Sequence, residues 1–252
     1  MAIARAAGQT PQANGSSGVT TIAVTLPQAV VVGNSMFAVG GHTFSNLGSF
    51  SDNLGNVWVV DKVQFNAASE DHVSIGSCKN ITVGGSCTIT YASNGAAEIM
   101  GIVADEYSGL NGAILDKTAG NTGTGTAVDT GTTATTTEAD ELLIAGVKDA
   151  FDGVPYTWGS SFSLLAETSA GRSSSADRVV SAMAAYNATA TQNAANAYAA
   201  AIATYKGTPS GPGVNAPRIR SRGLGNLALL DAEDEGRFNE LDARNWWRMG
   251  LV

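Results

Sequence analysis

The sequence predicts an all-β fold: a jelly-roll-like antiparallel β-sandwich followed by an extended C-terminal arm. The first observation is composition, because charged residues make up only 14% of the chain and hydrophobic residues 44%. Thr, Ser, Asn and Gly must then supply most of the polar surface, and these residues suit strands and turns. The second observation is spacing, since about twelve short apolar or alternating runs are separated by turn-forming residues, as in a sandwich.

The predicted strands follow one another closely along the chain. They lie at residues 2–6, 19–26, 35–44, 57–65, 72–77, 88–91, 98–107, 113–117, 140–147, 162–167, 175–186 and 197–205. The last two runs are rich in alanine, which also permits a helix, but their length and their position favour returning strands. Between the runs, residues 8–18 are predicted as a polar, turn-rich segment. The Thr-rich residues 120–137 are predicted as an extended strand pair facing solvent.

Composition changes near residue 207 and divides the chain into three parts. Residues 1–206 form the predicted sandwich domain, residues 207–217 a linker, and residues 218–252 a C-terminal anchoring arm. The linker holds three of the six prolines and three glycines, so it favours an extended segment. The arm has acidic residues before its apolar positions and arginines near its end, a pattern compatible with a short terminal helix.

Charge and hydropathy exclude several classes of protein. The net charge is −8, whereas binding of nucleic acid needs clustered Lys and Arg, so no nucleic-acid partner is expected. No run of apolar residues is long enough to span a bilayer, so no membrane partner is expected. The first residues lack the continuous apolar region of a secretory signal. The chain is therefore expected either to stay in the cytoplasm where it is made, or to leave as part of an assembly or by another route.

Two cysteines, Cys78 and Cys87, flank a Gly84-Gly85 turn. A hairpin there would allow a disulfide, but cytoplasmic synthesis favours two free thiols. Together with the distant His42 and His72, the cysteines lack the spacing of zinc ligands. The acidic loops also lack the spacing of an EF-hand. No metal and no cofactor are therefore expected.

The adjacent carboxylates Asp105 and Glu106 are the strongest candidates for catalysis. A glycosidase needs two carboxylates that face one cleft. Consecutive residues of a strand point to opposite faces, so these two side chains are predicted to face apart. His42 lies among apolar residues without an acidic or nucleophilic partner at motif spacing and is predicted as a hydrogen-bonded structural histidine. No catalytic residue is therefore assigned, and the chain is not expected to be an enzyme.

The arm contains the strongest candidates for binding a partner. Two of the four tryptophans, Trp246 and Trp247, lie beside arginines after the linker. Trp and Arg are enriched at binding hot spots, and a segment behind a linker can order on a partner. The arm is therefore predicted to dock on a neighbouring subunit rather than on its own sandwich. The residues predicted to bind are Arg218, Arg220, Arg222, Phe238, Leu241, Arg244, Trp246, Trp247, Arg248 and Met249.

Three phrases in order carry a resemblance to a known family: SDNLGNVW (51–58), DEYSGLNGAILD (105–116) and TTTEADELLIAG (135–146). They resemble the D-x-x-G-N-x-W turn, the E-Y-S-G-L strand end, and the T-rich loop with an apolar strand of a jelly-roll-like β-sandwich domain. That domain recurs in structural proteins of tailed phages and in bacterial surface proteins. The resemblance covers about residues 18–206 and implies display or attachment, with no catalytic residue to transfer.

The leading prediction is a virion structural protein of a tailed bacteriophage, in capsid decoration or in a tail or fibre. Its partners would be other virion proteins, and a homo-oligomer, with a trimer favoured, would suit display. The alternative is a carbohydrate-binding or adhesive module that contacts host surface glycans. In that case exposed aromatic residues such as Trp58, Tyr156 and Trp158 would stack on sugar rings. A third hypothesis is a glycoside hydrolase that uses Asp105 and Glu106.

Overall fold

The computed structural model describes residues 2–44, 47–95, 98–151, 154–159 and 161–208, with the backbone alone for residues 111, 113 and 114. Within these ranges the chain forms fifteen β-strands and no helix, which confirms the all-β prediction. Every described residue belongs to one compact unit, Met1–Gly211. The predicted arm, with its short helix, lies outside the described residues.

The central layer is a six-stranded antiparallel sheet. Its strand order is β1-β9-β4-β7-β6, and β2 also pairs with β9. Strands β4 and β7 are buried at nearly every position, because both faces of this sheet are covered by other sheets. The strands are β1 (Ala4–Arg5), β2 (Gln12–Val19), β4 (Ser35–Thr43), β6 (Val59–Asn66), β7 (Asp71–Cys78) and β9 (Glu98–Ser108).

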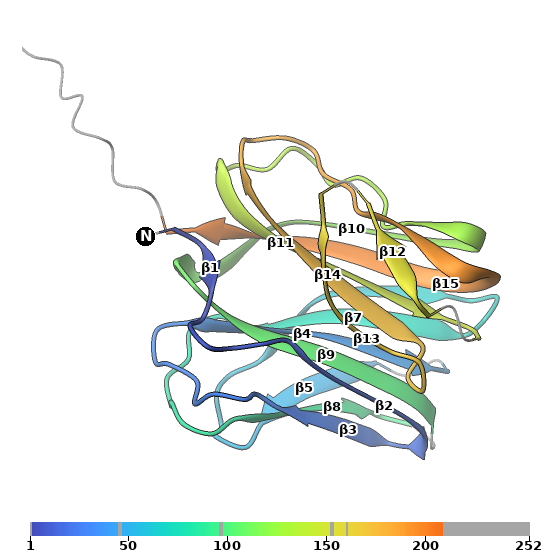
Figure 1. The fold of residues 1–252 in the computed structure, drawn as a ribbon, viewed down its shortest axis with the longest axis horizontal. Coiled ribbons are helices and arrows are strands. Elements are labelled where there is room, and N and C mark those ends of the chain that lie inside the picture. The colour runs from blue at the N-terminus through green and yellow to red at the C-terminus, as the bar shows by residue number, and fades with distance from the viewer. Residues whose placement is uncertain (1, 45–46, 96–97, 152–153, 160, 209–252) are drawn as a thin grey trace, which may run out of the picture. The chain divides into compact units, whose positions relative to one another are not determined.

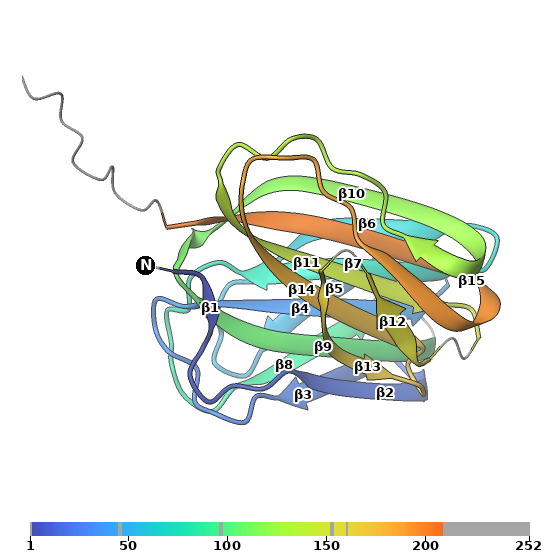
Figure 2. The same ribbon diagram turned by 45° about the horizontal axis from the view of Figure 1, so that its top comes forward.

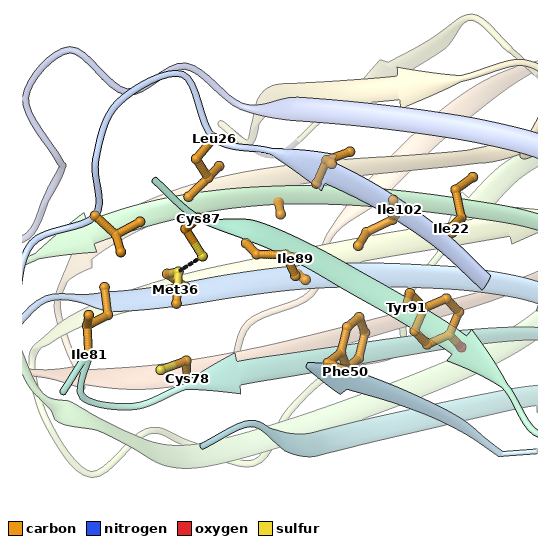
Figure 3. Close-up of a cluster of buried hydrophobic side chains, with 14 of the residues drawn as sticks. Ile22, Leu26, Met36, Phe50, Cys78, Ile81, Cys87, Ile89, Tyr91 and Ile102 are labelled. Atoms are coloured by element: carbon orange, nitrogen blue, oxygen red, sulfur yellow. Dashed lines mark hydrogen bonds between the residues drawn. The ribbon is translucent and has the colours of Figure 1, made fainter. Parts of the chain in front are cut away.

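A three-stranded sheet covers one face of the central sheet, as Figure 1 shows. Its order is β3 (Thr21–Thr25), β8 (Thr88–Ser93) and β5 (Gly48–Asp52). The core between the two sheets combines Ile22 and Ile89 of the smaller sheet with Met36 and Ile102 of the central one (Figure 3). Tyr91 lies over Gly40, where a Cβ would come within 2.6 Å of the ring, so this position requires glycine.

A second six-stranded sheet covers the opposite face of the central sheet (Figures 1 and 2). Its order is β10-β15-β11-β14-β13, with β12 paired to β15. The alanines of β15, among them Ala199, Ala201 and Ala203, pack against Phe37 and Val39 of β4. The strands are β10 (Leu110–Asp129), β11 (Asp140–Asp149), β12 (Tyr156–Trp158), β13 (Ser163–Thr168), β14 (Ser173–Ser181) and β15 (Thr189–Gly207).

The predicted sandwich is therefore confirmed as stacked antiparallel sheets, and the central sheet is shared by two cores. The run 197–205 lies within β15, as predicted, whereas the run 175–186 is a strand only as far as Ser181. The turn-rich prediction for residues 8–18 is wrong in its second half, because Gln12–Val19 pairs with β9 as β2. Gly15 of β2 lies against Gly171, and a Cβ there would overlap Thr168, so its small residues serve close packing rather than turns.

The hairpin predicted around Gly84-Gly85 is also wrong. Strand β7 belongs to the central sheet and β8 to the three-stranded sheet, so the segment between them crosses from one sheet to the other. Cys78 and Cys87 are free, as predicted, and both are buried. The Cys87 thiol contacts the sulfur of Met36 at 3.7 Å (Figure 3). Burial raises the pKa of Cys78 to about 11 and that of Cys87 to about 12.

The Thr-rich segment forms one strand and a ladder rather than a strand pair. Strand β10 ends at Asp129, and Thr130, Thr133 and Thr136 then lie buried against residues 184–188. The amide of Thr133 donates to the carbonyl of Tyr186 at 2.8 Å, and the amide of Tyr186 donates to the Thr133 hydroxyl at 3.0 Å. Thr130 and Thr136 repeat this exchange with residues 188 and 184. The ladder lies beside the hydrophobic cluster of the second six-stranded sheet that contains Tyr186 and Ala188.

Candidate functional site

The D-x-x-G-N-x-W phrase builds a rigid turn after β5. One carboxylate oxygen of Asp52 accepts the amides of Leu54 (2.8 Å) and Asn56 (3.2 Å), while the other accepts the indole N–H of Trp58 at 2.8 Å. Gly55 takes the left-handed conformation, with φ of 79°. The Asn56 side chain then holds residues 82–83 through their amides. Each defined residue of the phrase thus has a structural role.

Asp105 and Glu106 face opposite sides of β9, as strand geometry predicts. Glu106 accepts hydrogen bonds from Gln9 (2.7 Å), from the Val31 amide (2.9 Å) and from Asn34 (2.7 Å), and so fixes the loop before β4. Asp105 instead pairs with Arg5 of β1. Glycoside hydrolysis requires two carboxylates that face one cleft. Asp105 and Glu106 do not have this arrangement.

Asp105 belongs to a charged cluster that joins the central sheet to the second six-stranded sheet. The Arg5 guanidinium also lies 3.7 Å from Asp177 of β14, and the Tyr107 hydroxyl donates to Asp177 at 2.6 Å. Burial raises the pKa of Asp105 to about 6, although the adjacent Arg5 opposes part of that rise. The cluster holds the N-terminal strand on the sandwich.

The three aromatic residues predicted to stack on glycans are not the exposed platforms that the alternative requires. Tyr156 is only 4% exposed, and its hydroxyl donates to Asp149. Trp58 is partly buried and stacks on Phe50 at 5.8 Å between ring centroids. Trp158 is also partly buried and donates from its indole to Ser174 at 2.9 Å. Their packing into the cores corrects the expectation that they are exposed.

The two histidines lie side by side inside the sandwich. His42 is fully buried and lies 2.6 Å from the Tyr91 hydroxyl, which confirms its prediction as a hydrogen-bonded structural residue. Its ring stacks on that of His72 at 4.6 Å, and Phe65 covers the second ring at 4.3 Å. Burial lowers the pKa of His72, which favours the neutral ring. Among the described residues, no group of His, Cys, Asp and Glu is arranged to hold a metal ion.

A pocket lies at the start of β9. Some of its residues are close to these histidines in the sequence: Thr43 follows His42, and Glu70 lies two residues before His72. Its volume is about 330 Å³. It is built from the end of β2, the end of β4 with the residue that follows it, the turn before β7 and the start of β9. The residues that line it are Gly18, Thr43, Phe44, Ser69, Glu70, Glu98 and Ile99.

Glu98 is the chemically unusual residue of this pocket. Its side chain is buried, with 2% of the residue exposed, and neither carboxylate oxygen has a hydrogen-bond partner among the described residues. Burial raises the pKa of Glu98, and the neighbouring Ser93 hydroxyl opposes part of that rise. A buried polar group without a partner is costly, so Glu98 is an unusual feature of the core-facing side of β9.

Two other pocket residues have an uncommon backbone conformation. Phe44 and Glu70 have φ of 72° and 58°, in the left-handed region that side chains other than glycine rarely adopt. Both residues are exposed, and Phe44 is 47% exposed although its side chain is a large aromatic group. Such strain is concentrated where a side chain must be presented in a set position.

The pocket escaped prediction because its residues come from four separate segments of the chain. One local signal could have identified Glu98. Alternate residues of a strand share one face, so Glu98 lies on the same face as Met100 and Ile102, and a carboxylate is expected on a buried face there. The ten arm residues predicted to bind a partner, from Arg218 to Met249, lie outside the described residues.

Comparison with known proteins adds no further identification, since no family model, no curated protein and no solved structure matches the chain. In the described part of the chain, no helix has the length and apolarity needed to cross a membrane.

Proposed function

We propose that this chain is a virion structural protein of a tailed bacteriophage, in capsid decoration or in a tail or fibre. Its sandwich is displayed on the particle, and the C-terminal arm docks on neighbouring subunits. The proposal includes a homo-oligomer, with a trimer as the favoured state. It rests on the three phrases of the sequence, on the Arg- and Trp-rich arm, and on the placement of the two ends of the sandwich.

The placement of the ends is the observation that carries the proposal. Ala4 pairs with Ser108, and the amide of Thr208 donates to the carbonyl of Gly109 at 2.8 Å, so both ends of the described chain lie at one end of the sandwich. The Glu98 pocket lies at the other end of β9, ten residues away, which is about 33 Å along an extended strand. A body held through its arm at one end would present the pocket at the other.

The rigidity of the body supports the same role. Its polar groups join the sheets, as the Arg5–Asp177 contact (3.7 Å) and the buried Lys148–Asp71 pair (3.1 Å) illustrate. Three stacked layers with cores on both faces of the central sheet provide a stiff support. A displayed domain needs such a support because its attachment and its presented surface lie far apart.

The test is removal of the arm. A truncated protein of residues 1–208 is expected to fold, by circular dichroism and thermal melting, and to be lost from purified particles. The variant Trp246→Ala/Trp247→Ala is expected to reduce incorporation strongly, while the matched control Trp246→Phe/Trp247→Phe retains more of it because large aromatic rings remain. Normal incorporation of the folded truncation would refute docking through the arm.

A further inference from the structure

Lys148 of β11 and Asp71 of β7 form a pair that is completely buried between two sheets. Both residues are 0% exposed, and the Lys148 nitrogen lies 3.1 Å from one carboxylate oxygen of Asp71. The stem of Lys148 passes over Gly41 of β4, where a Cβ would come within 2.8 Å of the lysine Cδ. An amine and a carboxyl group are therefore held in contact, away from water, between the central sheet and the second six-stranded sheet.

The surroundings disfavour the charged form of Lys148. Burial lowers the pKa of Lys148, and the attraction of the Asp71 carboxylate opposes part of this fall. The second carboxylate oxygen of Asp71 has no hydrogen-bond partner among the described residues. Transfer of one proton along the hydrogen bond between the two side chains gives a neutral amine beside a carboxylic acid. A neutral amine in a dry site is a nucleophile.

A second buried acid, Asp149, acts on the same amine. The Lys148 nitrogen donates to the carbonyl oxygen of Asp149 at 2.6 Å, and the Asp149 carboxylate also opposes the fall in the pKa of Lys148. The hydroxyl of Tyr156 donates to that carboxylate. Asp149 and Tyr156 are 0% and 4% exposed, so they offer a route for a proton that does not need solvent.

We propose that Lys148 and Asp71 condense to an intramolecular amide, an isopeptide bond that joins β11 to β7 covalently. The Lys148 nitrogen bonds to Cγ of Asp71, and the bond from Cγ to one carboxyl oxygen breaks. That oxygen leaves as water with one hydrogen from the carboxylic acid and one from the amine, which Asp149 relays. Nothing is oxidised or reduced. Before the amide forms, the same two groups hold the sheets as an ion pair, and unfolding energies of that pair refer to the uncondensed chain.

The test follows the mass of the full-length protein. The mass is measured after purification and during incubation for several days, in native buffer and in urea. The folded protein is expected to become lighter than its sequence by one water molecule, and urea should stop any further loss because it separates the two groups. In a tryptic digest, a branched peptide should join residues 63–79 to residues 118–172, because an amide at Lys148 blocks cleavage there.

Two lysine variants serve as the matched pair. Lys148→Arg keeps a cation beside Asp71, but a guanidinium group stays protonated and does not condense, so the water loss and the branched peptide should both be absent. Lys79→Arg alters a pair in which Lys79 lies 3.3 Å from Asp61 but is 35% exposed, and it should leave both signals unchanged. If Lys148→Arg fails to fold, the branched peptide of the unaltered protein still decides.

Each pattern of results has a defined meaning. Loss of one water molecule together with the branched peptide supports the bond. A folded protein that keeps its full mass through the incubation overturns the proposal. A water loss that persists in Lys148→Arg, or that maps to another place such as a succinimide at an Asp-Gly sequence, overturns it as well. The measurement does not involve the arm, so its failure leaves the particle-incorporation test untouched.

Discussion

Replacing Asp52 with alanine tests whether the D-x-x-G-N-x-W phrase is a structural element. The substitution removes an acceptor that holds the amides of Leu54 and Asn56 and the indole of Trp58. A hydrogen bond to a charged group contributes about 1.5 to 3 kcal/mol when buried, and less at a partly exposed position such as this one. Since water can solvate part of the freed groups, we expect a loss of about 2 to 4 kcal/mol in the free energy of unfolding.

The assay is urea unfolding of residues 1–208, followed by tryptophan fluorescence and by circular dichroism. For a domain of this size the expected loss corresponds to a fall in Tm of about 10 °C. Asp52→Asn keeps an oxygen for the backbone amides and should lose only about 1 kcal/mol. A double-mutant cycle with Trp58→Phe, which keeps the ring on Phe50, should give a coupling of about 1 kcal/mol. If Asp52→Ala stays within about 0.5 kcal/mol of the parent protein, the turn does not stabilise the fold and the reasoning fails.

Three further predictions follow from buried groups. Cys78 and Cys87, with thiol pKa values raised to about 11 and about 12 by burial, should resist alkylation by iodoacetamide at pH 8 until urea unfolds the protein. Lys148→Met should cost about 3 to 5 kcal/mol because Asp71 is left buried without its cation, and adding Asp71→Asn should recover much of the loss in urea unfolding. Burial raises the pKa of Glu141 from 4.5 to about 7, so the unfolded chain ionises first and stability falls as pH rises between these values, by roughly 3 kcal/mol. Glu141→Gln should abolish this fall, and an unchanged pH profile would contradict the assignment.

Much of the sandwich could be predicted from local pattern. Apolar runs such as Ser35–Thr43 and Asp140–Asp149 form strands that are buried along most of their length. The parity of β9 also placed Asp105 and Glu106 on opposite faces, and their partners lie accordingly on different sides of the central sheet. These predictions succeeded because each depends only on the two-residue repeat of a single strand.

Other features could not be predicted because they depend on contacts between distant segments. Gln12–Val19 resembles a turn in composition, yet it pairs with β9 and needs small residues where Gly171 approaches. The Thr130–Thr136 ladder repeats every third residue, a period that belongs to neither a helix nor a strand. The Glu98 pocket joins four segments, none of which carries a motif, so only the folded chain brings Phe44, Glu70 and Glu98 together.

The central claim, that the chain is a structural component of a virion, is tested most directly by the composition of purified particles. Under this proposal, quantitative mass spectrometry of gradient-purified virions, from a phage whose genome carries this sequence, should find the chain at a fixed ratio to the major capsid or tail protein. That ratio should persist through washing in high salt, because an aromatic anchor is held largely by apolar contacts. Absence of the chain from purified virions, with the protein present in the lysate, would contradict the claim.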